Sequence, residues 1–240
     1  MTGRNLFYAI TLLAVAISIS SCNDNEQVIF EADADVYWLS KMNDGEIQHG
    51  VYYFAYGNNP INTVTVTLPG GEEIDLDKSF NAATTWANEP DSVDFKGEFP
   101  EAGSYLFNVV SESGETVQVS EMLEIDSLEI PVFTQVEYND TILGYNLEWD
   151  DVEGAEAYLV KLINEDGVIV YNSYAVNGDV NAYNILQGGS GYWDESPSAN
   201  ETYVLQILAY LFDDDADNSN YVYNVQQISM GETTIVWGEE

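Results

Sequence analysis

The sequence is poor in the residues that most catalytic and metal-binding sites need. It holds one cysteine, one histidine and five lysine or arginine residues, against 42 aspartate and glutamate residues. A single cysteine cannot form an intrachain disulfide, and with one histidine it cannot supply the usual ligands of a zinc site. The formal net charge is −37. Nucleic acid is therefore not expected as a partner, and an anionic lipid surface would repel the chain.

Catalytic motifs are also lacking. His49 stands at the start of a predicted strand, where an exposed edge position is expected. Ser190 lies in a glycine-rich run, but Tyr192 occupies the place of the second glycine of a nucleophile elbow, and no lysine follows as in a phosphate loop. So many acids produce chance carboxylate pairs, and nothing marks any two of them as a glycosidase pair. The sequence predicts a protein that is not an enzyme and needs no cofactor.

Long apolar runs are scarce, and the one near the start is short. It extends over residues 6–19 and follows Arg4. A membrane-spanning helix needs about 20 apolar residues, so this run is too short to span. A basic start followed by a short apolar run is typical of a cleaved leader. We therefore expect a signal peptide over residues 1–21.

The end of this leader resembles a bacterial lipobox. Residues 19–22 read Ile-Ser-Ser-Cys, and the resemblance implies that Cys22 is acylated and anchors the chain to the membrane. A plain secretory signal beside a chance cysteine is the alternative. Residues 22–27 form an acidic tether similar to the signal that sends many Bacteroidota lipoproteins to the cell surface. The resemblance implies an outer-membrane, lipid-anchored protein that faces the cell exterior.

The rest of the chain reads as strands separated by turns. Hydrophobic residues make up 45% and aromatic residues 13% of the sequence, which is enough for packed cores. Short segments rich in Val, Tyr, Phe and Thr alternate with turn formers, and they predict an all-β fold of antiparallel sandwiches. The segments include 92–99, 221–228 and 233–237. A charged stretch before Pro131 suggests two tandem domains, over residues 28–126 and 129–240.

Two resemblances refine this prediction. Residues 147–150 read Leu-Glu-Trp-Asp and are followed by Gly-Ala-Glu-Ala-Tyr at 154–158, which resembles strands B and C of a fibronectin type III domain. Residues 200–209 resemble strand F of that family, with Tyr203 as its corner tyrosine. In the first half, residues 99–109 are similar to the late hairpin of immunoglobulin-like and PKD-like domains. The resemblances imply folds and no activity.

Three aromatic residues fall outside clear strands. They are Trp86, Tyr192 and Trp193. Loop aromatics beside Asn and Asp can stack on sugar rings, so the three residues are candidates for ligand contact. Packing against the neighbouring domain is the alternative use.

An acidic run near the C-terminus is the best candidate for an ion site. Asp213, Asp215 and Asp217 alternate at the spacing of the first ligands of a calcium loop. The glycine and the glutamate expected later in that motif are replaced by Asn218 and Asn224. Weak Ca²⁺ binding and a solvated acidic turn both remain open.

Three short segments resemble the Asp-Ser/Thr-apolar signal for O-glycosylation of exported Bacteroidota proteins. The hydroxyl residues in them are Ser92, Ser127 and Thr141. Each lies beside a predicted strand or the predicted domain junction, where a modifying enzyme has access.

These features together predict a lipid-anchored surface module that binds or adheres without catalysis. Its partners would be the membrane, through the lipid, and either a glycan or an envelope protein. The alternative function is a structural spacer or scaffold subunit of an envelope complex.

Overall fold

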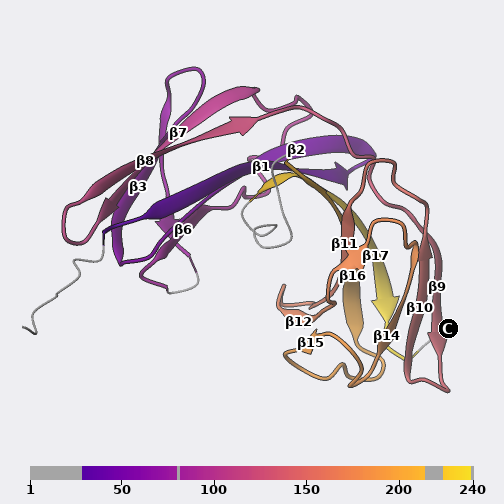
Figure 1. Ribbon diagram of the computed structural model, residues 1–240. Coiled ribbons are helices and arrows are strands. Elements are labelled where there is room, and N and C mark those ends of the chain that lie inside the picture. Colours follow the sequence, from indigo (N-terminus) through magenta and orange to yellow (C-terminus); the bar gives the residue numbers. More distant parts are fainter. Residues whose placement is uncertain (1–28, 80–81, 214–223, 239–240) are drawn as a thin grey trace, which may run out of the picture. The chain divides into compact units, whose positions relative to one another are not determined.

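The computed structural model describes residues 29–79, 82–213 and 224–238, and all of these residues lie in strands, turns or extended segments (Figure 1). The described part contains no helix, so none that could span a bilayer. The prediction of an all-β fold is confirmed. The architecture below is that of residues 31–240, which form one compact unit.

Seventeen strands make up this unit. They are β1 (Ala32–Asn43), β2 (Glu46–Gly57), β3 (Ile61–Thr67), β4 (Glu73–Asp75), β5 (Asp77–Lys78), β6 (Thr85–Asn88), β7 (Gly103–Ser111), β8 (Thr116–Leu123), β9 (Phe133–Asn139), β10 (Gly144–Trp149), β11 (Ala157–Asn164), β12 (Ile169–Asn172), β13 (Val176–Asn177), β14 (Ala182–Leu186), β15 (Tyr192–Trp193), β16 (Thr202–Phe212) and β17 (Val225–Val236).

The strands form three sheets. A ten-stranded sheet has the order β15-β12-β11-β16-β17-β1-β2-β6-β5, with β13 paired to β11. A three-stranded sheet, β14-β10-β9, shares a core with β11, β12, β16 and β17, and a four-stranded sheet, β4-β3-β7-β8, packs on the β1 and β2 region. Strands alternate buried and exposed side chains, as half-buried strands do. The predicted sandwich architecture is confirmed.

The residues that carry the fibronectin resemblance lie where it implies. Trp149 on β10 is fully buried, and its ring meets that of Tyr158 on β11 edge to face at 5.2 Å. The Tyr203 hydroxyl accepts a hydrogen bond from the Ser198 amide at 2.9 Å. Tyr105 in the first half bonds the backbone in a similar way, because its hydroxyl donates to the Glu101 carbonyl at 2.7 Å. Each tyrosine buries its ring and satisfies its hydroxyl locally.

Two predicted strand boundaries are wrong. Residues 92–99 form a turn, in which the amides of Asp91 and Asp94 each bond an oxygen of the other residue at 2.9 Å. Residues 225–236 form one strand where the sequence predicted two. Gly231 falls between the two predicted strands, but β17 continues through it, and a Cβ there would collide with the Pro131 carbonyl. The glycine therefore marks a close backbone approach within a strand.

β17 joins the two halves of the sequence in one sheet. It pairs antiparallel with β16 along its whole length and parallel with β1 from Trp38↔Gln227 to Lys41↔Met230. The β1–β17 ladder is the one parallel pair among the described strands. Backbone hydrogen bonding therefore runs without a break from β15 to β5.

A buried polar network holds this parallel pair in register. The Gln227 side chain donates to the Ser40 hydroxyl at 3.1 Å and accepts from the Leu128 amide at 2.8 Å. Ser229 donates to the Leu128 carbonyl at 3.0 Å. Ser40 also bonds Nδ1 of His49 at 3.1 Å, so the expectation that His49 is exposed is wrong. A shift of one residue would leave these buried groups without partners, at a cost of about 1–3 kcal/mol each.

Asp35 adds a second side-chain hydrogen bond between β1 and β17. Its side chain is 1% exposed, and Oδ2 accepts a hydrogen bond from the Val225 amide at 3.0 Å. Burial raises the pKa of Asp35 from 3.8 to about 9, with Asp213 and Glu121 adding to the rise and the Val225 amide opposing it. The folded protein therefore holds Asp35 protonated at neutral pH.

We expect Asp35→Asn to stabilise the protein more as the pH rises. Between pH 3.8 and about 9 the folded state carries a proton on Asp35 that the unfolded state has lost. In the wild-type protein, the contribution of this protonated carboxyl group to the free energy of unfolding is complete below pH 3.8. It is lost as the pH rises to about 9. Asparagine keeps the acceptor without a charge. Urea unfolding at about pH 5 and about pH 8 measures the difference.

Asp33→Asn controls for the general loss of one negative charge, because Asp33 is exposed on the same face of β1. His49 has the opposite pH dependence, since burial lowers its pKa, but it is common to both proteins and cancels in the difference. A gain from Asp35→Asn that is the same at both pH values would contradict the assignment.

Candidate functional site

The three predicted contact aromatics lie in different environments. Trp86 on β6 is half-buried, and its indole N–H is buried without a hydrogen-bond partner among the described residues. Trp193 is also half-buried and packs on the core of the second half, with its ring 4.4 Å from that of Tyr171. Tyr192 is 65% exposed. Of the three, Tyr192 alone presents most of its side chain to solvent.

Tyr192 has an aromatic neighbour from another strand. Its ring lies 5.0 Å from that of Tyr174 at an angle of 72°, and Tyr174 is itself 53% exposed. The β12–β15 ladder pairs Asn172 with Tyr192, which brings the two tyrosines together at the edge of the ten-stranded sheet. We call Tyr174 and Tyr192 the tyrosine pair.

The loop before Tyr192 is fixed by buried hydroxyl groups. The Tyr171 hydroxyl lies 2.7 Å from the Tyr183 hydroxyl and donates to the Ser190 carbonyl at 2.8 Å. Gly191 has φ of +116°, and a Cβ there would lie 2.6 Å from the Tyr171 hydroxyl. Glycine is therefore required at this position. The pair is presented by a loop whose geometry exists before any ligand arrives.

The hydroxyl of Tyr171 stays protonated at any physiological pH. Burial raises its pKa, and the hydrogen bond to Tyr183 raises it further. The donor that holds Ser190 is therefore insensitive to pH in the range where proteins work.

The tyrosine pair is suited to non-covalent binding of a ligand. Two rings near a right angle offer one exposed face and one exposed edge, and Asp194 and Glu195 follow as exposed acceptors. The apolar face of a sugar ring packs on such a face, while its hydroxyls donate to nearby carboxylates. The described residues contain no group of three or more His, Cys, Asp or Glu side chains that could hold a metal ion.

Other predicted sites are covered only in part. Asp213 follows β16, and its amide bonds the Asn224 carbonyl at 3.1 Å. Asp215, Asp217 and Cys22 lie outside the described residues, so calcium binding and acylation stay predictions.

The three hydroxyl residues predicted for glycosylation are all exposed. Ser92 lies in the turn after Pro90, Ser127 lies in the extended segment between β8 and β9, and Thr141 lies in the β9–β10 turn. Exposure gives an enzyme access to each of them, and their modification stays a prediction.

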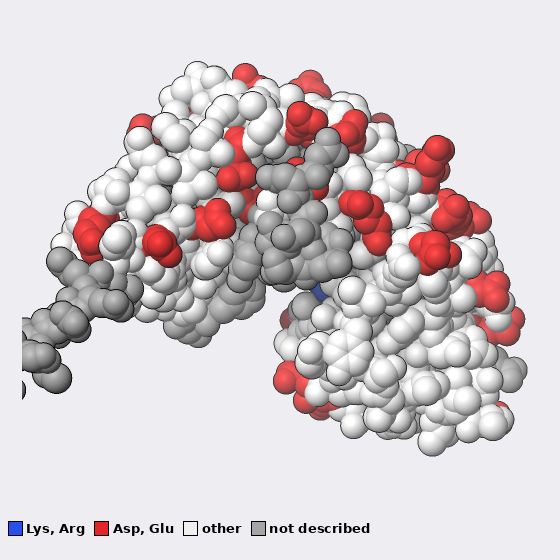
Figure 2. All heavy atoms as spheres, in the orientation of Figure 1, with Lys and Arg blue, Asp and Glu red and all other residues white. Residues whose placement is uncertain are grey.

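Acidic side chains are spread over the surface. Figure 2 shows carboxylates on many separate parts of the face in view, with very little exposed lysine. Most described acids are exposed, and Asp35 is the buried exception among the described carboxylates. The charge therefore forms a general negative field, which disfavours anionic ligands across this surface.

No family model matches the chain, and no curated protein sequence matches it. Similar solved structures include a segment of two fibronectin type III domains from chicken tenascin (TM-score 0.29, 11% identity, 85% of this chain and 97% of that one). A tetra-tandem repeat from the extending region of a large adhesion protein aligns with TM-score 0.28, 13% identity and 86% and 50% coverage of the two chains. The BSP domain of a biofilm-associated protein gives TM-score 0.25, 12% identity and 87% and 30% coverage. The fold assignment rests on the strand order and the cores described above.

Sequence patterns missed Tyr174. It ends an apolar segment and carries no local mark of exposure, so only the β12–β15 pairing reveals that it lies beside Tyr192. Tyr192 itself was found because a glycine-rich loop precedes it.

We expect Tyr171→Phe to loosen the loop that carries the tyrosine pair. The change removes the donor to Ser190 and the partner of Tyr183, and the loss of such buried bonds costs about 1–3 kcal/mol of unfolding free energy. Urea unfolding measures this loss, and hydrogen exchange at the amides of Gly191 and Tyr192 should become faster. Tyr174→Phe is the matched control, because it removes an exposed hydroxyl and should change stability by less than about 0.5 kcal/mol. Equal effects of the two changes would contradict the role of Tyr171.

Proposed function

We propose that this chain is a non-catalytic binding module of the cell surface that contacts glycans through the tyrosine pair. The carrying observation is the pair itself: two tyrosines, 53% and 65% exposed, in contact at 72°, with the loop before Tyr192 fixed by the Tyr171 hydroxyl. Large apolar side chains rarely stay exposed together on a rigid loop without a partner. Because the loop is already ordered, little entropy is lost on binding.

The expected ligand is an uncharged saccharide. The negative field of the chain opposes sulfated, phosphorylated or uronic-acid glycans, whereas a neutral sugar meets no such barrier. A neutral sugar also supplies hydroxyl donors for the carboxylates of Asp194 and Glu195, which follow the pair.

The second candidate function is a structural spacer or scaffold subunit of an envelope complex. One observation favours it: β17 pairs with strands from both halves, so backbone hydrogen bonds continue through the ten-stranded sheet. A chain built in this way resists separation of its halves. In this function the tyrosine pair would contact another envelope protein.

Attachment through Cys22 belongs to the proposal. The lipobox-like residues 19–22 support it, and multiple acyl chains on one cysteine would hold a repelled, acidic protein at a membrane. We expect metabolic labelling with an alkynyl palmitate to mark the wild-type protein in the membrane fraction. Cys22→Ala should be unlabelled. An unlabelled, freely soluble wild-type protein would overturn the anchor.

A glycan array tests the binding function. We expect the protein to bind neutral saccharides and Tyr174→Ala/Tyr192→Ala to lose at least about tenfold in affinity, which is about 1.4 kcal/mol. Tyr174→Phe/Tyr192→Phe is the matched control, because it keeps both rings and should keep most of the binding. A silent array together with co-purification of another envelope protein would favour the scaffold function instead.

A further inference from the structure

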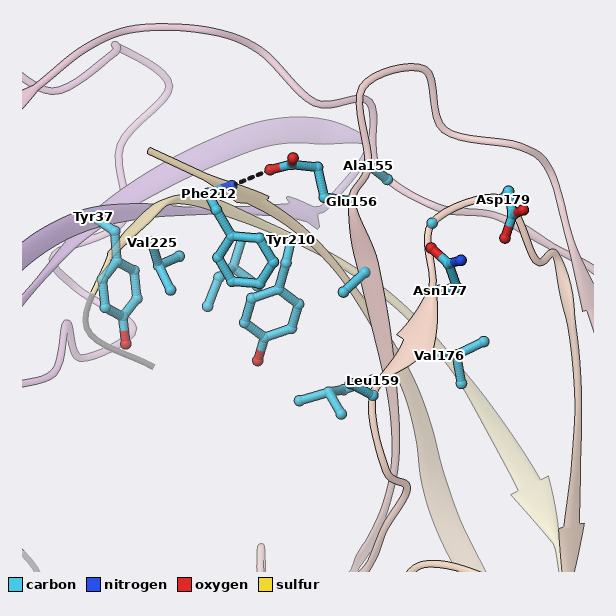
Figure 3. A pocket seen from close by; sticks show the side chains of 14 residues that line it. Tyr37, Ala155, Glu156, Leu159, Val176, Asn177, Asp179, Tyr210, Phe212 and Val225 are labelled. Carbon is cyan, nitrogen blue, oxygen red and sulfur yellow. Dashed lines mark hydrogen bonds between the residues drawn. The ribbon is translucent and has the colours of Figure 1, made fainter. Parts of the chain in front are cut away.

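A groove of about 920 Å³ lies on the ten-stranded sheet, on the face of β16, β17 and β1 that points away from the cores of the two sandwiches. Figure 3 shows it between the side chains of Tyr37, Tyr210 and Phe212 and the short strand β13. Pockets of about 300–1,000 Å³ hold drug-sized ligands, so a segment of a few residues fits this volume. None of the predicted contact aromatics lines it.

The floor of the groove is apolar. Leu159 on β11, Val225 and Ile228 on β17 and the rings of Tyr210 and Phe212 on β16 form it. The Tyr37 ring stacks on Tyr52 at 4.9 Å and 14°, and Tyr210 and Phe212 stack at 6.0 Å and 25°. These rings contact one another, as those of the tyrosine pair do, but they are half-buried, whereas Tyr174 and Tyr192 are exposed. They therefore offer less free ring face to a sugar.

The polar groups at the groove are tyrosine hydroxyls, the Asn177 amide and two carboxylates, and only the carboxylates are acceptors alone. Burial raises the pKa of Tyr210 to about 12 and also raises that of Tyr37, so both hydroxyls stay neutral. Their hydroxyl oxygens point in the same direction in Figure 3. The carboxylates of Glu156 and Asp179 stand at the rim, and both residues are exposed.

Glu156 is held in place and keeps capacity for a ligand. Its Oε2 accepts a hydrogen bond from the Phe212 amide at 2.9 Å, which fixes the carboxylate over the end of β16 (Figure 3). A carboxylate offers about four acceptor positions, so one backbone bond does not saturate it. A fixed carboxylate loses less side-chain entropy when it binds a donor than a mobile one does.

No lysine, arginine or histidine is among the described residues that line the groove. Lys161 lies two residues beyond Leu159 on the same face of β11, and burial lowers the pKa of its ammonium group. Lys41 on β1 lies over the Phe95 ring, with Nζ 3.7 Å from the ring centre. The described residues that line the groove therefore combine an apolar floor with two carboxylates and no cationic side chain.

We propose that this groove docks a lysine- or arginine-bearing peptide segment of a partner protein. A long cationic side chain matches both the apolar floor and the acidic rim of the groove. Its methylene stem covers apolar surface, and its charged head donates hydrogen bonds to carboxylates. The negative field of the chain attracts such a segment and repels a second copy of this chain. This inference is independent of glycan binding at the tyrosine pair, which lies elsewhere on the sheet.

The probe is a fluorescent peptide of alternating lysine and valine, and its anisotropy is measured with the full mature chain at about 0.15 M salt. We expect Glu156→Gln/Asp179→Asn to weaken binding at least about tenfold. Glutamine at 156 keeps an acceptor for the Phe212 amide, so the unfolding midpoint should hold. The matched control is Glu165→Gln/Asp166→Asn in the β11–β12 turn, which removes the same charge away from the groove and should change the dissociation constant by less than about twofold.

A second variant tests the groove by shape instead of charge. Ala175 lines it and is exposed, so Ala175→Trp should fill the groove and weaken binding of the probe without unfolding the protein. A peptide with glutamine in place of lysine should bind at least about tenfold more weakly than the probe. Equal losses in the two double variants would show diffuse attraction and overturn the proposal. It would also fail if the glutamine peptide or maltoheptaose bound the groove as tightly as the probe. Glycan binding at the tyrosine pair should be unchanged in Glu156→Gln/Asp179→Asn. Ala175 directly follows Tyr174, so Ala175→Trp is assessed with the peptide probe alone.

Discussion

The parallel pairing of β17 with β1 is the interaction on which the rest of this structure depends. It places the last strand of the chain beside the first and makes one sheet from strands of both sequence halves. The sheet accommodates this junction because the side chains of Gln227, Ser229 and Ser40 form hydrogen bonds with one another and with the Leu128 backbone. Buried polar groups with full partners specify one register, whereas an apolar seam would permit several.

The two proposed binding surfaces use aromatic residues in opposite ways. On the face of the ten-stranded sheet, cross-strand rings stack on one another and leave an apolar floor edged by acceptors. At the sheet edge, the tyrosine pair is held apart from the core by a glycine-rich loop and offers ring surface to solvent. The first arrangement suits a cationic side chain with a long stem, and the second suits a sugar ring.

Much of the fold could be predicted from the sequence, because strand composition and turn residues are local signals. Trp149 and Tyr203 were placed correctly by their resemblance to a fibronectin type III pattern. The exceptions are also physical. Gly231, between two predicted strands, serves a close backbone approach within one strand, and Val93, in a segment predicted as a strand, lies in a turn closed by hydrogen bonds between Asp91 and Asp94. Trp86, Tyr192 and Trp193 were expected outside strands, but they lie on β6 and β15, because cross-strand pairing extends the sheet to them. The partner of Tyr192, Tyr174, depends on a ladder that no local pattern encodes.

The sequence by itself determined the all-β class, the excess of negative charge and the scarcity of cysteine and histidine, since these depend on composition and short-range pattern. Only the tertiary structure decided that Asp35 is buried and protonated, that His49 lies inside a polar network, and that an acceptor-lined groove exists. Each of these needs residues far apart in the chain: Asp35 bonds Val225, which lies 190 positions later. Burial and long-range pairing set the charge state of a group, and neither can be predicted from the residues next to it in the sequence.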